Sequence, residues 1–146
     1  MSIDDLLSEF EFLGDWEDRC DYLIDLGFEL PEMPVEAKTE ANRVHGCQSN
    51  VWLITDVKRT NGEPVIEIIA DSDSQIVKGL IAVLLTIYSG KTPKEMLAID
   101  VKEIFDRLGL SRNLSPQRKN GLNGMVQKIR GLAAMIREGE QGERGT

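Results

Sequence analysis

The sequence contains little cysteine and histidine, which limits the disulfide and metal chemistry open to it. Only two cysteines, Cys20 and Cys47, and one histidine, His45, occur among the 146 residues. A secreted domain that depends on a disulfide framework normally carries more cysteines. Two reduced thiols are therefore the simpler interpretation, and a Cys20–Cys47 disulfide is the alternative. A closed metal site would need carboxylate ligands in addition, because there is no third thiol.

Long apolar runs and an excess of positive charge are also absent. The longest largely apolar stretch, residues 79–87, is well short of the roughly 20 residues that a membrane-spanning helix needs. The acidic residues 1–5 are not typical of a secretory signal peptide. A net charge of −8 and a pI near 4.7 oppose binding to nucleic acid or to anionic membranes. We therefore expect a cytoplasmic protein that binds neither.

What is present is the composition of a folded domain. Hydrophobic residues make up 41% of the chain and charged residues 29%, which is typical of a globular protein. A chain of this length buries one core and is too short for two sizeable ones. We expect one domain over residues 1–146, with residues 139–146 as a frayed tail.

The first third of the chain predicts two amphipathic helices. Apolar residues recur at helical spacing behind Ser2, whose hydroxyl can cap the first turn, and Gly14 ends this helix. Asp15 then begins a second helix, in which Cys20 lies on the packed face. Residues 28–40 contain two prolines and no sustained period, which predicts an irregular connection.

A β-hairpin and a central helix follow. Residues 51–58 and 64–70 are rich in β-branched side chains, and Asn61-Gly62 between them is a strong turn signal. A third strand near residues 43–44 is an alternative. Ser72 and Gln75 predict a capping box for a helix over residues 73–88. Its apolar residues surround it almost completely, so other elements must cover it, and Gly79 predicts a close approach by one of them.

The remaining sequence predicts further helices. Thr92 and Glu95 form a second capping box before a short helix, and residues 101–108 form another that Gly109 ends. Ser115-Pro116 begins the last helix, which carries one apolar stripe. Helices, then a hairpin, then helices, without βαβ alternation, predict an α+β fold in which a small antiparallel sheet packs against several helices.

Cys47 is the strongest candidate for chemistry. It follows Gly46 on a predicted bend just before a strand, so we expect its thiol to be presented rather than buried. Sulfur exchange requires an accessible thiolate. A nearby cation would raise the ionised fraction of a thiol whose ordinary pKa is about 8.5. His45, two residues upstream, is one candidate, with a plain polar loop residue as the alternative interpretation.

Three segments in this order resemble the SufE-type sulfur acceptor proteins of iron–sulfur cluster assembly. Residues 46–52 (GCQSNVW) are similar to that family's active-cysteine segment. Residues 71–80 (DSDSQIVKGL) and 114–122 (LSPQRKNGL) are similar to its strand-to-helix junction and its C-terminal signature. Asn50 stands where many members carry glutamine. With Trp16 and the proline-containing connection, the resemblance extends over roughly residues 10–137.

The resemblance implies a function and a fold. A protein of this kind accepts a persulfide sulfur from a cysteine desulfurase on Cys47, stimulates the desulfurase, and passes the sulfur to an iron–sulfur cluster scaffold complex. It acts as an accessory to the desulfurase rather than as a stand-alone enzyme. It would need no cofactor or metal of its own, because the desulfurase carries the pyridoxal phosphate. The implied fold is the α+β one shared with IscU-type scaffolds.

The resemblance also suggests further site residues. Arg118 matches a characteristic arginine, and a guanidinium near Cys47 would favour the thiolate and the persulfide. A first-turn helix residue paired with a carboxylate is the alternative for Arg118. The partner-binding residues implied are Gly46, Gln48, Ser49, Asp71 and Asp73, although the two aspartates also fit a plain role at a helix start.

Two other functions compete with sulfur transfer. An iron–sulfur or zinc-binding scaffold of similar fold is the first, and the small number of thiol and imidazole ligands opposes it. The second is an acyl-transfer enzyme with Cys47 as nucleophile and His45 as base. Such an enzyme also needs an orienting group and oxyanion donors, and no independent motif marks them.

Overall fold

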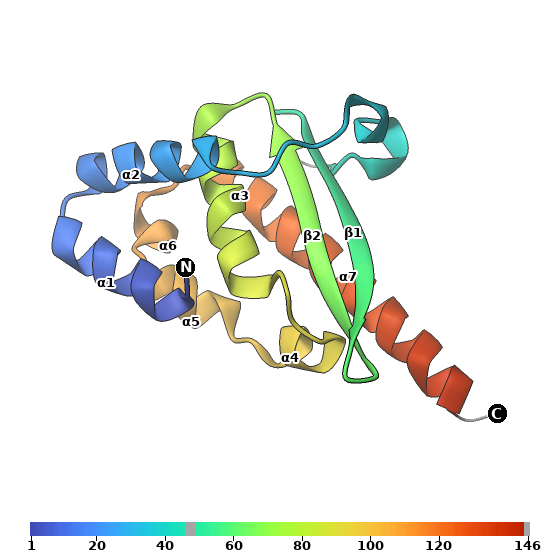
Figure 1. Ribbon diagram of the computed structural model, residues 1–146. Coiled ribbons are helices and arrows are strands. Elements are labelled where there is room, and N and C mark those ends of the chain that lie inside the picture. The colour runs from blue at the N-terminus through green and yellow to red at the C-terminus, as the bar shows by residue number, and fades with distance from the viewer. Residues whose placement is uncertain (46–48, 145–146) are drawn as a thin grey trace.

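The computed structural model describes residues 1–45 and 49–144, with side chains as far as Gly139, and shows an antiparallel two-stranded sheet among helices (Figure 1). In chain order the elements are α1 (Ile3–Leu13), α2 (Trp16–Phe28), the 3-10 turns η1 (Val35–Ala37) and η2 (Glu40–Asn42), β1 (Val51–Thr60), β2 (Glu63–Ser72), α3 (Gln75–Tyr88), α4 (Pro93–Ala98), α5 (Val101–Arg107), α6 (Leu110–Asn113) and α7 (Pro116–Arg144). The α+β fold predicted from the sequence is confirmed.

Local capping chemistry sets several helix ends where the sequence predicts them. Ser2 and Asp5 form a reciprocal capping box at α1, and Thr92 and Glu95 form one at α4. Asp15 caps α2 by accepting the backbone N–H of Glu17. These interactions lie within three residues of each other along the chain, which is why the sequence predicts them.

The hairpin has the predicted turn and register. Val51 pairs with Ser72 at one end and Thr60 with Glu63 at the other. Asn61 and Gly62 both have positive φ angles, 54° and 82°, as a two-residue hairpin turn requires. Alternate residues of β2 and of the first part of β1 face the core, and the buried ones are Val51, Leu53, Pro64, Ile66, Ile68, Ala70 and Ser72.

Helix α3 lies at the centre of the fold, between α2 and the hairpin (Figure 1). Most of its residues are buried, as its apolar composition predicts. Gly79 allows α2 to approach: a Cβ there would lie 2.3 Å from the carbonyl oxygen of Leu23. Gly27 of α2 also allows a close approach to α3, because a Cβ built on it would lie 2.8 Å from the Cβ of Lys78. The predicted close approach at Gly79 is confirmed.

Helix α7 covers the core with the predicted apolar stripe. The buried members of the stripe are Leu122, Met125, Val126, Ile129 and Ala133. The helix continues to Arg144, past Gly139, where the sequence predicted the start of a frayed tail. Glutamate, glutamine and arginine are good helix formers, and they extend α7 beyond the body of the fold (Figure 1).

Two other local predictions need correction, and one short helix was not predicted. Ser72 does not cap α3, because the helix begins at Gln75 after Ser74, and the Ser72 hydroxyl instead accepts the backbone N–H of Ser74. In the part of the chain that the structure describes, Arg43 makes only an isolated bridge to Trp52 and no third strand forms. The one-turn helix α6 was not predicted. It follows Gly109, whose φ is +76°, and it buries Leu110.

No helix among the described residues is both long enough and apolar enough to cross a lipid bilayer.

Candidate functional site

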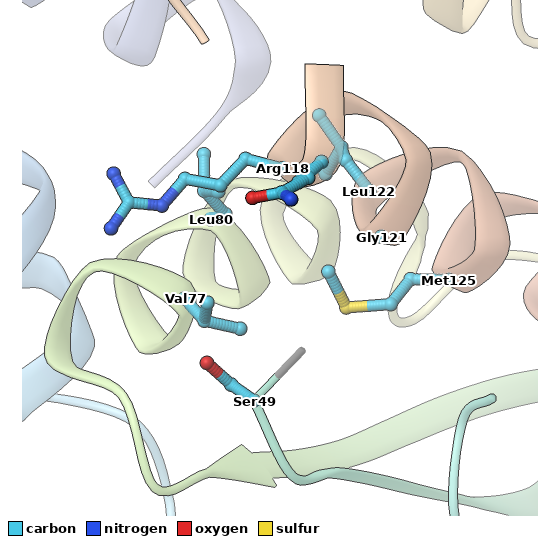
Figure 2. A pocket seen from close by; sticks show the side chains of 8 residues that line it. Ser49, Val77, Leu80, Arg118, Gly121, Leu122 and Met125 are labelled. Carbon is cyan, nitrogen blue, oxygen red and sulfur yellow. The ribbon is translucent and has the colours of Figure 1, made fainter. Parts of the chain in front are cut away.

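A small pocket of about 90 Å³ lies where α3 and α7 meet Ser49, two residues before β1 (Figure 2). Its floor is apolar and its rim is polar. The floor consists of Val77, Leu80, Leu122 and Met125, all of them buried. Ser49, Gln117 and Arg118 supply the polar rim, with Gly121 beside them. An apolar pocket with a few polar groups at its edge is typical of a binding site.

Cys47, Gly46 and Gln48 lie outside the described residues, whereas both flanking residues contact α7. Ser49 lines the pocket together with Arg118. The carbonyl oxygen of His45 would lie 3.4 Å from a Cβ built on Gly124. Helix α7 therefore runs beside both ends of the segment that contains Cys47.

Arg118 extends from the first turns of α7 along the rim of the pocket, past Leu80 (Figure 2). Its backbone N–H donates to the Ser115 hydroxyl, as expected of a first-turn residue. Its side chain is exposed and makes no ion pair with any side chain that the structure describes. The alternative of a carboxylate-paired arginine therefore does not hold within the described part of the chain.

The charge of Arg118 also acts on the thiol of Cys20. Burial raises the pKa of Cys20, and the positive charge of Arg118 opposes that rise, while Asp21 and Glu17 add to it. The Cys20 thiol is unbonded and half-buried on α2. Arg118 thus lies close enough to α2 for its field to favour an anionic sulfur.

Asn50 is held by Asp73, at the junction of β2 and α3. The Asp73 carboxylate accepts the backbone N–H of Asn50 at 3.1 Å and its side-chain amide at 2.9 Å, one on each oxygen. The backbone N–H of Asp73 donates to the Asn50 carbonyl at 3.3 Å. Asn50 lies between Ser49, the first described residue after the Cys47 segment, and the start of β1, so these bonds fix the position at which β1 begins. Sequence reasoning missed this role of Asn50, because its partner is 23 residues away.

Asp71 forms ion pairs within its own chain. Its carboxylate lies 2.9 Å from Nζ of Lys38 and 3.5 Å from Nζ of Lys78, and its side chain is only 16% exposed. Burial by itself would raise the pKa of Asp71. The hydrogen bonds from Lys38 and the Ser72 N–H, together with the charge of Lys78, outweigh burial and lower the pKa. Lys38 also lies over the ring of Trp52, 5.5 Å from its centre.

His45 lies on the outside of the site. Its side chain is 72% exposed, and its Nε2 is 3.5 Å from a carboxylate oxygen of Glu40, which is equally exposed. The described pocket lining does not include it. The support of the Cys47 thiol by His45 stays a prediction, because Cys47 lies outside the described residues.

The described side chains contain no group of three or more His, Cys, Asp or Glu residues close enough together to hold a metal ion. That finding does not cover Cys47. The structure thus brings together Ser49 and Arg118 among the predicted site residues, and it places Asp71, Asp73 and His45 outside the pocket lining.

A family model and two relatives with similar sequences indicate one family. The model of the SufE domain, described as an Fe–S metabolism associated domain, matches residues 4–133. An uncharacterised SufE-like protein of Rhizobium etli is 48% identical over 129 residues, which cover 88% of this chain and 87% of that protein. Another from Rhizobium meliloti is 44% identical over 132 residues, or 90% of this chain and 94% of that protein. The solution structure of a hypothetical protein from Thermus thermophilus shares the fold, with a TM-score of 0.71 at 21% identity, over 92% of this chain and 97% of that one.

Proposed function

This chain belongs to the SufE family, whose domain is associated with iron–sulfur metabolism, and on that premise we propose that Cys47 accepts a persulfide sulfur from a cysteine desulfurase. The protein stimulates the desulfurase by removing its persulfide, and passes the sulfur to an iron–sulfur cluster scaffold complex. It acts in the cytoplasm as an accessory protein. The observation that carries the proposal is the match of the family model across the segment that contains Cys47.

The proposed reaction is a thiol–persulfide exchange and needs no oxidant or reductant. The Cys47 thiolate attacks the outer sulfur of the desulfurase persulfide, and the sulfur–sulfur bond of the donor breaks. The donor cysteine leaves as a thiolate and Cys47 becomes the persulfide. A thiolate of the receiving protein then attacks the outer sulfur of the Cys47 persulfide. The sulfur–sulfur bond on Cys47 breaks, and Cys47 leaves as a thiolate.

Arg118 supports the charged forms in this scheme. Both the thiolate and the persulfide are anions, and a guanidinium within a few ångströms lowers the pKa of such a group. Ser49 lines the same pocket as Arg118, two residues from Cys47. We assign Arg118 to stabilising the sulfur anion, and Gly46, Gln48 and Ser49 to contact with the partner. We also assign Asp71 and Asp73 to contact with the partner, in addition to their bonds to Lys38, Lys78 and Asn50 within the chain.

The chain itself needs no cofactor or metal for this exchange. The pyridoxal phosphate that releases sulfur from cysteine belongs to the desulfurase. Every step assigned to this chain is a nucleophilic displacement at sulfur.

The test is persulfide formation on the full-length protein. Wild type, Cys47→Ser and Cys20→Ser are each incubated with the cysteine desulfurases of the source organism, pyridoxal phosphate and cysteine. We expect the mass of one additional sulfur atom on the peptide that contains Cys47 in wild type and in Cys20→Ser. Cys47→Ser should remain unmodified. An unmodified Cys47 with every desulfurase, or sulfur found on Cys20 alone, would overturn the proposal.

A further inference from the structure

Positive charge is concentrated in one segment of this acidic protein. From Arg107 to Arg137 the sequence has seven basic residues and no acidic one, whereas residues 1–106 have twenty-two acidic and nine basic residues. The basic residues are Arg107, Arg112, Arg118, Lys119, Lys128, Arg130 and Arg137. This segment contains the last residue of α5, all of α6 and most of α7, so its charge lies on consecutive elements rather than spread over the fold.

Other charged side chains in the structure do not neutralise these residues. Within the described part of the chain, none of the seven forms an ion pair. Lys119 and Arg130 donate hydrogen bonds to the backbone carbonyls of Ser111 and Leu97, which leaves their charge uncompensated. Arg112 and Arg118 are exposed.

Arg112 meets a further arginine, Arg19 of α2, at Gly109. A Cβ on Gly109 would lie 2.9 Å from Nη1 of Arg19 and 3.5 Å from Nη2 of Arg112. Arg19 is fixed in this position, because its Nε donates to the carbonyl of Phe10 at 2.8 Å and its guanidinium lies over the Phe10 ring. Two guanidiniums this close repel one another, and a carboxylate bound between them would relieve the repulsion.

A third arginine, Arg118, lies at the candidate site. Arg118 lines the pocket, and its charge reaches Cys20, the residue next to Arg19 on α2. We call Arg19, Arg112 and Arg118 the arginine face. It extends from the pocket beside Ser49 across to the start of α2.

We propose that the arginine face docks an acidic surface of the protein that donates sulfur to Cys47. This inference rests on the proposed function and adds the chemistry by which the partner is recognised. An acidic partner is repelled by the excess of carboxylates that this protein carries, and is attracted to the basic face that the described arginines form. Such a field raises the association rate and orients the encounter. Planar guanidiniums also bind carboxylates through two parallel hydrogen bonds.

Arg112 is the residue to test, because it is exposed and lies outside the pocket lining. Arg112→Glu is compared with Lys94→Glu, which makes the same charge change at an exposed position on α4. The association rate with the desulfurase is measured by stopped flow at low and high salt, and persulfide formation on Cys47 is measured at saturating desulfurase. Near-ultraviolet circular dichroism checks that both variants are folded, and Arg112→Lys should retain most of the wild-type rate.

We expect Arg112→Glu to lower the association rate by about ten-fold at low salt and by less than about two-fold at 0.5 M salt, because salt screens the attraction. Lys94→Glu should change it by less than about two-fold, and persulfide formation at saturation should be unchanged in both variants.

If Cys47 of wild type acquires sulfur but Arg112→Glu associates as fast as Lys94→Glu, the arginine face is not the docking surface and the proposed function stands. If the defect appears only with the scaffold complex, the assignment to the sulfur donor is wrong. If wild-type Cys47 acquires no sulfur, the proposed function fails and this inference fails with it.

Discussion

Asp73 holds Asn50 by three hydrogen bonds, two from Asn50 to its carboxylate and one from its own backbone N–H to the Asn50 carbonyl. The two residues join the end of the Cys47 segment to the turn between β2 and α3. The position of Ser49 beside the pocket therefore depends on a contact between parts of the chain that are 23 residues apart.

The first prediction concerns this contact. Replacing Asp73 by Ala leaves the Asn50 N–H and amide without their acceptor, so the Cys47 segment should lose its fixed end. Because these hydrogen bonds are exposed to solvent, we expect the free energy of unfolding to fall by only about 1 kcal/mol. We expect persulfide formation on Cys47 to slow by roughly five- to ten-fold, on the scale of 1 to 1.4 kcal/mol. Mass spectrometry of the Cys47 peptide over time gives the rate.

A double-mutant cycle tests whether the effect belongs to the pair. Asn50→Ala, Asp73→Ala and the double variant should show strongly non-additive rates, because the second substitution removes a contact that the first has already broken. Additive effects would mean that Asp73 and Asn50 act independently of each other.

The second prediction concerns Arg118 and the ionisation of Cys47. In a Cys20→Ser background, the rate of Cys47 alkylation by iodoacetamide follows the thiolate fraction, so its pH profile gives the thiol pKa. Arg118→Ala should move the midpoint upward by about 0.5 to 1 pH unit, because a cation that favours the anion is lost. Arg118→Lys retains the charge and should move it less. A midpoint common to all three proteins would show that Arg118 does not act on the thiol.

The third prediction is the pH dependence that Asp71 contributes to stability. The pKa of Asp71 is lower in the folded protein than its ordinary value, so the ionised carboxylate stabilises the fold. That contribution is complete above the unfolded-state pKa of about 3.9 and is lost as the pH falls through the lower folded-state pKa. Asp71→Asn should therefore destabilise the protein at pH 7, by on the order of 1 kcal/mol.

Urea unfolding at pH 7 and near pH 3 measures the difference. Asp71→Asn and wild type should approach the same free energy of unfolding at the lower pH. Asp73→Asn, two residues further along the chain, serves as the carboxylate-to-amide control. Asp73 forms no ion pair with a lysine in the described structure. If wild type and Asp71→Asn differ in free energy of unfolding by the same amount at both pH values, the ion-pair explanation is contradicted.

The fourth prediction concerns the packing of α2 on α3. A methyl group on Gly79 would meet the backbone of Leu23 at 2.3 Å, and backbone atoms cannot move aside as the end of a side chain can. Gly79→Ala should lower the free energy of unfolding by about 3 kcal/mol or more. Gly131→Ala in α7 is the matched control, because a Cβ there meets nothing within 4 Å. It should stabilise the protein by about 0.5 to 1 kcal/mol. Similar thermal midpoints for the two variants would refute the close approach.

The sequence by itself determined the elements whose causes are local. The capping boxes at Ser2 and Thr92 and the Asn61-Gly62 turn depend on residues a few positions apart, so their chemistry is visible in the letters. Where a residue could support either of two local structures, the sequence alone did not decide between them. Ser72 can cap a helix or support a turn, and the pairing of β2 with β1 as far as Ser72 decided for the turn.

The motifs similar to the SufE family identified Cys47 and Arg118 as candidates, but only the tertiary structure decided what surrounds them. The pocket shared by Ser49 and Arg118, the hold of Asp73 on Asn50, and the approach of Arg19 to Arg112 each join residues from separate elements. The positions of these residues depend on how α2, α3 and α7 pack. That packing is determined by the burial of apolar surface and not by the polar side chains that it brings together. The spacing of residues along the chain therefore does not show which of these polar side chains come close together.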